Sequence, residues 1–371
     1  MALGSYDDPL LDWLRTEAFR RSGLFGRQKA GAGDSLLRRL VKTVKTEMAK
    51  DKPDQWKVER VAAQLEGPPL EVGEDSVAAG MQLYLEILER GRFGGDRIQS
   101  SLLYALGRAA QEQTVAFWQK MFSVTIPRDR FSRKRKRFAA AALAWLVVTR
   151  DSTAATDSLI EACGSDNEHA RSEAIRHLHI LCADEAREVP PAVWETLEAV
   201  AAGDSAFEPR YLARLALLES ERQIPGEGEK KVFGFEVKLK GFAGFKAVLE
   251  LRGDSSFDIL ASTILRAFGW DMDHMFEFHL TGKRSDKDFV LGGGGLFGWN
   301  GEEDDRTPLP EPTLAESGIA PRHSFVFLFD FGDYHYFNVK TLHVAEPERG
   351  VRYPRIVSTK GTPPEQYPEW D

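Results

Sequence analysis

The spacing of hydrophobic residues divides the chain into two parts with different secondary structure. In residues 1–222, apolar residues recur with a helical period, most clearly in Val77–Leu88, Ile98–Ala109, Phe138–Val148, Ile175–Leu181 and Leu212–Leu218. Turn-forming segments rich in Gly, Pro and Asp separate these stretches, and no alternating strand pattern lies between them. The pattern predicts an all-helical domain over residues 1–222. Its tryptophans lie on the helical stripes and are expected in the core: Trp13, Trp56, Trp118, Trp145 and Trp194.

An internal repeat underlies this helical pattern. An arginine is followed three residues later by alanine or serine at Arg97/Ser100, Arg137/Ala140, Arg171/Ala174 and Arg210/Ala213, with spacings of 40, 34 and 39 residues. Each pair falls at the start of a predicted second helix, where a small residue lets neighbouring helices approach closely. The repeat resembles HEAT-type repeats, in which antiparallel helix pairs stack into a curved solenoid. A generic helical bundle is the alternative interpretation.

The hydrophobic pattern changes after residues 223–230, which have the composition of a linker. Val232–Leu239 and Ala247–Leu251 alternate, which predicts a β-hairpin that turns near residues 241–244. Phe257–Phe268 has a helical period, with Asp254 to Ser256 available as its cap. Further strands are predicted over residues 275–280, 324–331, 336–342 and 352–357. Residues 231–371 are therefore expected to form an α+β domain whose sheet is covered mainly on one face.

Composition and charge narrow the class of protein. No apolar run reaches the roughly 18 residues that span a bilayer, and only Cys163 and Cys182 are present, so we expect a cytoplasmic protein without a disulfide framework. Residues 223–371 hold 17 Lys and Arg against 24 Asp and Glu, a net charge of −7 out of −8 for the whole chain. Because a polyanion would be repelled by this part, nucleic-acid contacts are expected only in the N-terminal part.

Three ordered motifs in the C-terminal part resemble a known family. They are Trp270 with His274 and Phe278, the run Phe329-Asp330-Phe331-Gly332-Asp333 before an aromatic strand, and Tyr353-Pro354-Arg355 followed by the Pro363-Pro364-Glu365-Gln366-Tyr367-Pro368 close. From about residue 232 to 371, the chain resembles the plasmid pRi ORF-three-like domain family, named for open reading frame three of a root-inducing plasmid. The resemblance implies an α+β fold, frequent on mobile elements and bacterial chromosomes, with no generally agreed activity. Many members carry Trp and His shortly after the second Asp, where this chain has His335 and Phe337.

The Asp-Phe-Gly-Asp motif is the best candidate for an acidic site. Asp330 and Asp333 end a buried strand, and with His335 they could ligate a divalent metal or act as an acid–base pair. The alternative is structural: the aspartates cap backbone N–H groups of a tight turn, and Gly332 supplies an unusual φ. The structural alternative is favoured, and the sequence predicts no metal and no cofactor.

Two other segments are candidates for partner binding. Seven cations lie within residues 128–137, and the five consecutive ones are the candidate contacts for an acidic partner or nucleic acid: Arg133, Lys134, Arg135, Lys136 and Arg137. The long loop over residues 292–312 carries Phe297 and Trp299, which we expect to contact a partner. Its glycines formally fit a dinucleotide motif, but an acidic run follows instead of the required helix, which argues against nucleotide binding.

Three functions remain open from the sequence. The leading hypothesis is a non-enzymatic interaction or adaptor protein, in which a helical-repeat scaffold carries a recognition domain and a protein partner is expected. The first alternative is a nucleic-acid-binding protein that uses Arg128–Arg137. The second is a metal-dependent hydrolase at Asp330, Asp333 and His335. No motif for catalysis is complete, so the sequence leans away from an enzyme.

Overall fold

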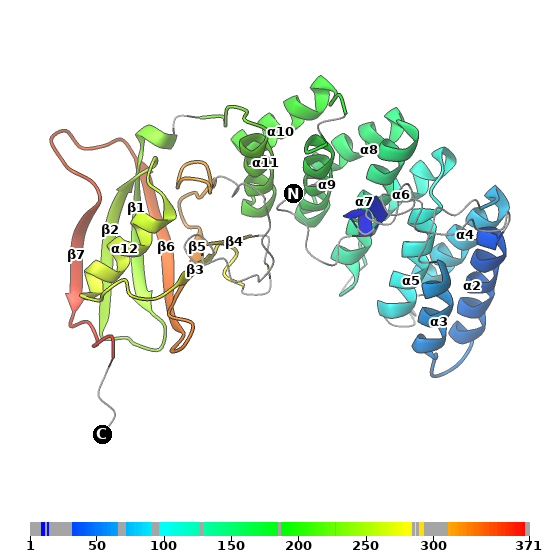
Figure 1. Ribbon diagram of the computed structural model, residues 1–371, viewed down its shortest axis with the longest axis horizontal. Coiled ribbons are helices and arrows are strands. Elements are labelled where there is room, and N and C mark those ends of the chain that lie inside the picture. Colours follow the sequence, from blue (N-terminus) through cyan, green and yellow to red (C-terminus); the bar gives the residue numbers. More distant parts are fainter. Residues whose placement is uncertain are drawn as a thin grey trace. The chain divides into compact units, whose positions relative to one another are not determined.

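A computed structural model describes residues 9–11, 13–14, 32–65, 72–90, 96–126, 129–184, 187–226, 228–283, 286, 289–292 and 311–367. The chain forms two compact units, one made of residues 4–193 and one built on residues 194–371. The division falls before the segment 223–230 that the sequence marks as a linker. Most of α10 (Pro191–Gly203) and all of α11 (Phe207–Glu219) therefore share a unit with the sheet (Figure 1).

The first unit is helical throughout its described residues. Its α-helices are α2 (Ala32–Met48), α3 (Gln55–Ala62), α4 (Glu74–Arg90), α5 (Asp96–Arg108), α6 (Val115–Ser123), α7 (Ser132–Arg150), α8 (Thr153–Cys163) and α9 (Glu168–Cys182). Short 3₁₀ turns, η1 (Ala63–Leu65) and η2 (Glu112–Thr114), follow α3 and precede α6. Side chains of Asp54, Ser152 and Asn167 accept hydrogen bonds from the first turns of α3, α8 and α9, which explains where these helices begin. The helical periods predicted for this unit are confirmed as α4, α5, α7 and α9.

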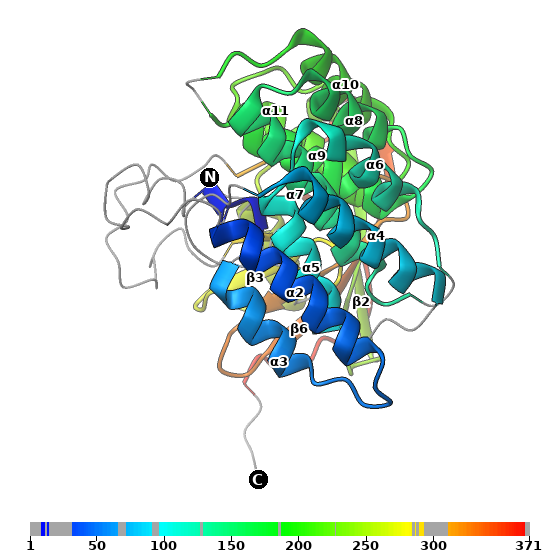
Figure 2. The same cartoon turned by 90° about the vertical axis from the view of Figure 1, so that its right-hand side faces the viewer.

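Each helix of the first unit packs against near neighbours in the sequence, some against the next helix, as in α2–α3 and α8–α9, and some against the next but one. Alternate helices contact each other in the series α3, α5, α7 and α9, and in the pairs α2–α4 and α6–α8 (Figure 1 and Figure 2). Helix α7 contacts α5, α6, α8 and α9, so it is enclosed on most sides. Its segment from Phe138 to Val147 is buried at every position. Trp13, Trp118 and Trp145 lie in the core as expected, but Trp56 is 63% exposed and stacks under Arg97, so its expected burial is wrong.

The second unit is built on one antiparallel sheet. Its seven strands lie in the order β4-β3-β5-β6-β1-β2-β7. The strands are β1 (Val232–Leu239), β2 (Phe245–Arg252), β3 (Phe276–His279), β4 (Val290–Leu291), β5 (Ser324–Phe329), β6 (His335–Ala345) and β7 (Arg355–Gly361), and a short 3₁₀ turn, η3 (Gly228–Lys230), precedes β1. The α+β prediction is confirmed, and the structure adds β4, a strand too short to show a period in the sequence.

Aromatic side chains on one face of the sheet form the core beneath α12 (Phe257–Phe268). Phe257 packs edge-on against Phe278 of β3, while Phe268 packs against Phe245 of β2 and Phe337 of β6. The helix crosses this face of the sheet (Figure 1). Its N-cap is Ser256, whose side chain accepts from Ile259 N at 3.3 Å. The opposite face carries polar pairs such as Lys246–Glu236 and Arg355–Glu250, so helix coverage falls on one side as predicted.

Helix α11 belongs to the core of the second unit. Its Phe207 ring stacks on His323 with centroids 4.0 Å apart, and Tyr211 packs against Phe289 at 5.3 Å. Arg210 Nε donates to the carbonyl oxygen of Gly318 at 2.8 Å. These contacts cover Phe289 and His323, which directly precede β4 and β5. Across the described residues, no helix combines the length and the hydropathy that crossing a membrane requires.

Candidate functional site

The turn between β5 and β6 is organised by Asp330. This residue is 5% exposed and adopts a left-handed backbone with φ 59°. Its Oδ1 accepts from Gly332 N at 2.7 Å and from Asp333 N at 3.4 Å, and its carbonyl oxygen accepts from Tyr334 N at 2.7 Å. These bonds are those of an Asx turn, so the capping role expected for the aspartate is present. The expected role of Gly332 is wrong, because the positive φ values fall on Asp330 and Tyr334 instead.

The same turn brings three potential metal ligands together. One ligand atom from each of Asp330, Asp333 and His335 lies within 4.8 Å of the other two. The second carboxylate oxygen of Asp330 lies 3.7 Å from His274 Nε2. His335 packs against Trp270 with ring centroids 4.8 Å apart, and its Nε2 is buried without a hydrogen-bond partner among the described residues. The sequence-predicted acidic site is therefore a spatial cluster.

The closing Pro-Pro-Glu-Gln-Tyr-Pro motif docks onto the loop before β3. Trp270 Nε1 donates to Pro364 O at 2.8 Å, and Asp271 N donates to Gln366 Oε1 at 2.8 Å. Gln366 Nε2 donates back to Asp271 O at 3.1 Å, and the Tyr367 hydroxyl donates to Asp273 at 3.1 Å. Partial burial and the bond to Asp273 raise the pKa of Tyr367. The Trp270–His274, Asp-Phe-Gly-Asp and closing motifs thus meet at one end of the sheet, which their sequence separation did not reveal.

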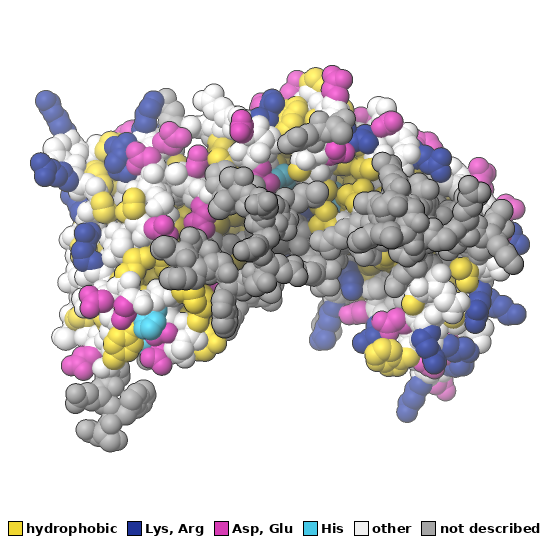
Figure 3. Space-filling model, in the orientation of Figure 1, with side chains coloured by type: hydrophobic (Ala, Val, Ile, Leu, Met, Phe, Trp, Pro, Cys, Tyr) yellow, Lys and Arg dark blue, Asp and Glu magenta, His cyan; other side chains and the backbone are white. Residues whose placement is uncertain are grey.

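Exposed hydrophobic side chains surround this meeting point. Met272, Met275, Tyr334 and Tyr367 are between 40% and 45% exposed. Their loops are joined by hydrogen bonds, since Asp330 N donates to Met275 O and Gln366 Nε2 donates to Asp273 Oδ1. Three exposed carboxylates, those of Asp271, Asp273 and Asp333, lie on the same loops. Figure 3 shows hydrophobic, acidic and histidine side chains side by side on this unit. We call the following seven residues the motif patch: Asp271, Met272, Asp273, Met275, Asp333, Tyr334 and Tyr367.

Two side chains of the basic run lie inside the first unit instead of on its surface. Arg135 and Lys136 have no exposed surface. Arg135 pairs with Asp129 at 2.6 Å, and Lys136 Nζ donates to the carbonyl oxygen of Phe122 at 2.6 Å. Burial and the neighbouring Arg135 lower the pKa of Lys136 to about 8. The expectation that these two side chains contact a partner is therefore wrong, because the enclosed position of α7 turns them inward.

The flanking cations of this run are also engaged. Arg137 Nε lies 3.1 Å from Glu173 Oε2, and Arg133 Nε lies 3.5 Å from Glu173 Oε1. Glu173 belongs to α9 and is completely buried, so these pairs join two helices. Among the five consecutive cations, all of which are described, Lys134 is exposed, Arg135 and Lys136 are buried, and Arg133 and Arg137 are partly buried. The other predicted contacts, Phe297 and Trp299, lie outside the described residues.

Comparison with known proteins agrees with the family resemblance of the second unit. Residues 231–368 match the family model described as "Plasmid pRiA4b ORF-3-like protein", which covers less than half of the chain. A solved structure of a protein of unknown function, MM3350 from Methanosarcina mazei Go1, is similar over 36% of this chain and 71% of that chain, with 18% identity and a TM-score of 0.28. No curated protein matches the chain. The C-terminal region is thus similar to a family without an assigned activity.

Proposed function

We propose that this chain is a non-enzymatic interaction protein whose α+β domain recognises a partner through the motif patch. The observation that carries the proposal is the gathering of Met272, Met275, Tyr334 and Tyr367 around the three motifs, each with at least 40% of its surface exposed. Exposed apolar groups that cluster within a polar rim mark interaction sites, whereas scattered ones do not. Tyrosine and methionine are also enriched at the centres of protein interfaces.

The charge of the patch selects the chemistry of the partner. Asp271, Asp273 and Asp333 are exposed and pair with no Lys or Arg among the described residues. A protein segment that carries Lys or Arg beside apolar residues would complement both components of the surface. We therefore propose a partner of basic and apolar character.

Contacts in the first unit support a scaffold made of repeats. Hydrogen bonds join side chains one repeat apart, as in Arg38 to Ser76, Gln119 to Ser158 and Ser152 to Glu112, which are separated by 38, 39 and 40 residues. These separations agree with the 34- to 40-residue spacing of the arginine motif. Together with the contacts between alternate helices, they favour a HEAT-like stack over a generic bundle, and such stacks present extended surfaces to partners.

Comparative capture of partners tests this function. Tagged wild-type protein, Tyr334→Asp and Leu342→Asp would be compared in native extract from cells that produce the chain. Tyr334 lies in the motif patch, while Leu342 is an equally exposed residue of β6 outside it (44% and 40% exposed). We expect one stoichiometric partner to be retained by wild type and Leu342→Asp and lost by Tyr334→Asp. Absence of a reproducible partner with wild type, or equal capture by all three proteins, would contradict the proposal.

A second candidate function, a divalent-cation site with hydrolytic chemistry, is favoured by the geometry of Asp330, Asp333 and His335. Donors around one ion lie about 3–4.4 Å apart when metal–ligand distances are about 2.0–2.2 Å, and the three ligand atoms lie within 4.8 Å of one another. A mixed oxygen and imidazole donor set suits Mn²⁺ or Zn²⁺. His335 and the two carboxylates would hold the ion, and the ion would polarise a bound water molecule.

Titration with Mn²⁺, followed by calorimetry, tests this candidate. Asp333→Asn would be compared with Asp258→Asn, a matched change at an exposed aspartate of α12. We expect Asp333→Asn to weaken Mn²⁺ binding by about tenfold or more, and Asp258→Asn to leave it unchanged. If wild-type protein binds neither Mn²⁺ nor Zn²⁺, the candidate is excluded.

The nucleic-acid alternative loses its main support. Within the run Arg128–Arg137, Arg135 and Lys136 are buried and Arg133 and Arg137 pair with Glu173, while Arg130 and Lys134 are exposed. Phosphate contacts require exposed cations. We therefore do not propose nucleic-acid binding by this run.

A further inference from the structure

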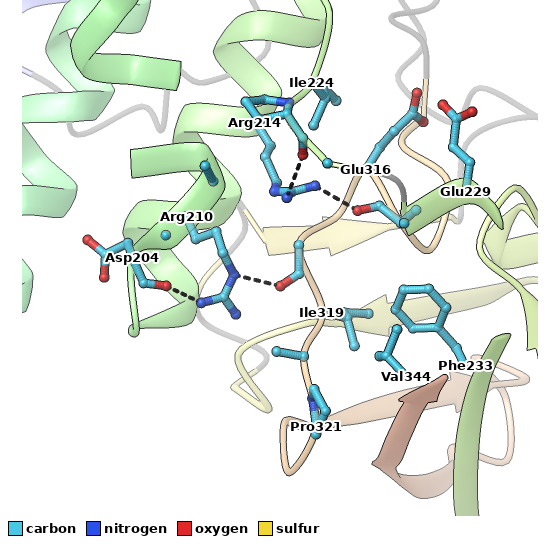
Figure 4. Close-up of a pocket in the computed structure, with 18 residues that line it drawn as sticks. Asp204, Arg210, Arg214, Ile224, Glu229, Phe233, Glu316, Ile319, Pro321 and Val344 are labelled. Atoms are coloured by element: carbon cyan, nitrogen blue, oxygen red, sulfur yellow. Dashed lines mark hydrogen bonds between the residues drawn. The ribbon is translucent and has the colours of Figure 1, made fainter. Parts of the chain in front are cut away.

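A cavity of about 340 Å³ lies within the second unit, apart from the motif patch. It is open to solvent on one side and is lined by α11, residues 224–226 and 228–229, the turn over residues 315–321 and the ends of β1 and β6 (Figure 4). Its volume falls at the lower end of the range of small-molecule sites, roughly 300–1,000 Å³. One wall is apolar, formed by Phe233, Ile319 and Val344, and the other carries Arg210 and Arg214.

The two arginines are held by backbone carbonyl groups rather than by carboxylates. Arg210 donates from Nε to Gly318 O and from Nη1 to Asp204 O and Ala206 O. Arg214 donates to Ala201 O, Ala315 O and Pro225 O. Each guanidinium has five N–H groups. Both N–H groups of Arg210 Nη2 therefore remain without a partner among the described residues.

The charge of these arginines is not neutralised by a direct ion pair. Within the described residues, no carboxylate oxygen lies within 4.0 Å of either guanidinium. Burial, together with Arg210, lowers the pKa of Arg214 to about 10, so both side chains remain cationic at neutral pH. Two like charges one helical turn apart and partly buried repel each other, and a bound anion would relieve this repulsion.

The nearby carboxylates limit which anion fits. Asp204 Oδ1 accepts from Ala206 N and Glu316 Oε2 accepts from Thr313 N, so both are committed to their own turns. The carboxylate of Asp204 points away from the Arg210 guanidinium, and those of Glu229 and Glu316 lie at the far end from Pro321 and Val344 (Figure 4). Three acidic groups at the rim would oppose a doubly charged phosphate more than a single carboxylate.

We propose that this cavity binds a small monocarboxylate, with its carboxylate on Arg210 Nη2 and its apolar body against Phe233, Ile319 and Val344. The two N–H groups of Arg210 Nη2 can donate charge-assisted hydrogen bonds to a carboxylate. The apolar wall selects a hydrocarbon body over a sugar or a nucleotide. This site is independent of the partner proposed for the motif patch.

Titration of the full chain with hexanoate, followed by saturation-transfer NMR, tests the proposal. Hexylamine tests whether the negative charge is required, and inorganic phosphate tests whether the hydrocarbon chain is required. Val344→Trp fills the apolar end of the cavity, and Leu342→Trp places the same side chain on β6 outside it. Arg210→Lys keeps the charge but removes the Nη2 donors. We expect hexanoate to bind wild type and Leu342→Trp, and to bind Val344→Trp and Arg210→Lys about tenfold or more weakly.

Three outcomes would overturn the proposal. The first is no binding of hexanoate by wild type at about 10 mM, a concentration that detects even weak sites. The second is binding of hexylamine or phosphate as tightly as hexanoate. The third is unchanged hexanoate binding by Val344→Trp. Thermal melting establishes that each variant is folded, and if Arg210→Lys is not, Val344→Trp decides.

Discussion

Glu173 shows how a single buried carboxylate can engage two cations of a basic run in the sequence. Its carboxylate contacts Arg137 and Arg133 of α7 and Arg176 of its own helix, at 3.1, 3.5 and 3.7 Å. Burial opposes its ionisation, but Arg137 and Arg176 hold its pKa below the ordinary value. Arg133 and Arg137, two of the cations that suggested a docking surface, therefore serve the packing of α7 against α9.

Removing the charge of Glu173 tests this structural role. Glu173→Gln keeps the shape of the side chain but removes the carboxylate charge that Arg133, Arg137 and Arg176 share. Breaking a buried ion pair in this way costs about 3–5 kcal/mol in the free energy of unfolding. Urea denaturation would measure this loss of stability. The control is Lys134→Gln, because Lys134 is an exposed residue of α7 next to Arg133. We expect the control to change stability by less than about 0.5 kcal/mol. A small effect of Glu173→Gln would show that the pairs are incidental.

His323 gives the second unit a predictable response to pH. Burial lowers its pKa from 6.5 to about 4, although the hydrogen bond to Leu280 O opposes this shift. In the unfolded chain the imidazole binds a proton below pH 6.5, while in the folded chain it stays neutral until about pH 4. The contribution of His323 to the free energy of unfolding is therefore fully present above pH 6.5. Up to about 3 kcal/mol of it is lost as the pH falls from 6.5 to 4.

Thermal unfolding between pH 7 and pH 4 would measure this loss. In His323→Phe, which keeps an aromatic ring against Phe207, the pH dependence of unfolding should become flatter. In His343→Gln, a change at a half-exposed histidine of β6, the wild-type slope should remain. Equal slopes in all three proteins would exclude His323 as the titrating group.

Among the elements, the β5–β6 turn can be tested for structural and chemical roles separately. Asp330→Asn keeps an oxygen acceptor for Gly332 N and tolerates the left-handed backbone, so we expect a loss of stability below about 1 kcal/mol. Asp330→Ala removes the acceptor and places Ala at φ 59°, which should cost about 1–3 kcal/mol. Chemical denaturation of the two variants measures the difference. If both variants lose the same stability, the Asx turn does not hold the motif together.

The elements also show what the sequence could and could not predict. Strand alternation located β1, β2 and β6, since each has one buried face, and the helical period located α12 with its Ser256 cap. The helical period could not show the orientation of Arg135 and Lys136, because a helix enclosed on most sides buries some of its polar positions too. The meeting of Trp270, Asp330 and Gln366 depends on sheet order and loop closure, which are long-range contacts that no local pattern contains.

At the scale of the whole molecule, the compact units do not divide where the composition changes. The linker-like segment 223–230 lies inside the second unit, and α11 supplies Phe207 and Tyr211 to the core on the other side of it. Phe289, which these side chains cover, is 1% exposed. Arg210, the last arginine of the spaced sequence motif, donates to Gly318 O of the α+β domain and to Asp204 O before its own helix. The same residue therefore serves both the repeat pattern and the sheet domain.

Truncation at two positions distinguishes the compact unit from the matched family region. A fragment of residues 190–371 keeps α10 and α11, whereas a fragment of residues 231–371 begins at the family match and lacks both. Exposing a large apolar side chain such as Phe289 costs about 1.5–3 kcal/mol, and the loss of α11 also leaves the carbonyl groups of Ala315 and Gly318 without their arginine donors. We expect the longer fragment to unfold cooperatively in urea and the shorter one to be less stable by several kcal/mol. If the shorter fragment is as stable as the longer one, α11 does not contribute to the stability of the domain, and the folding domain begins at residue 231.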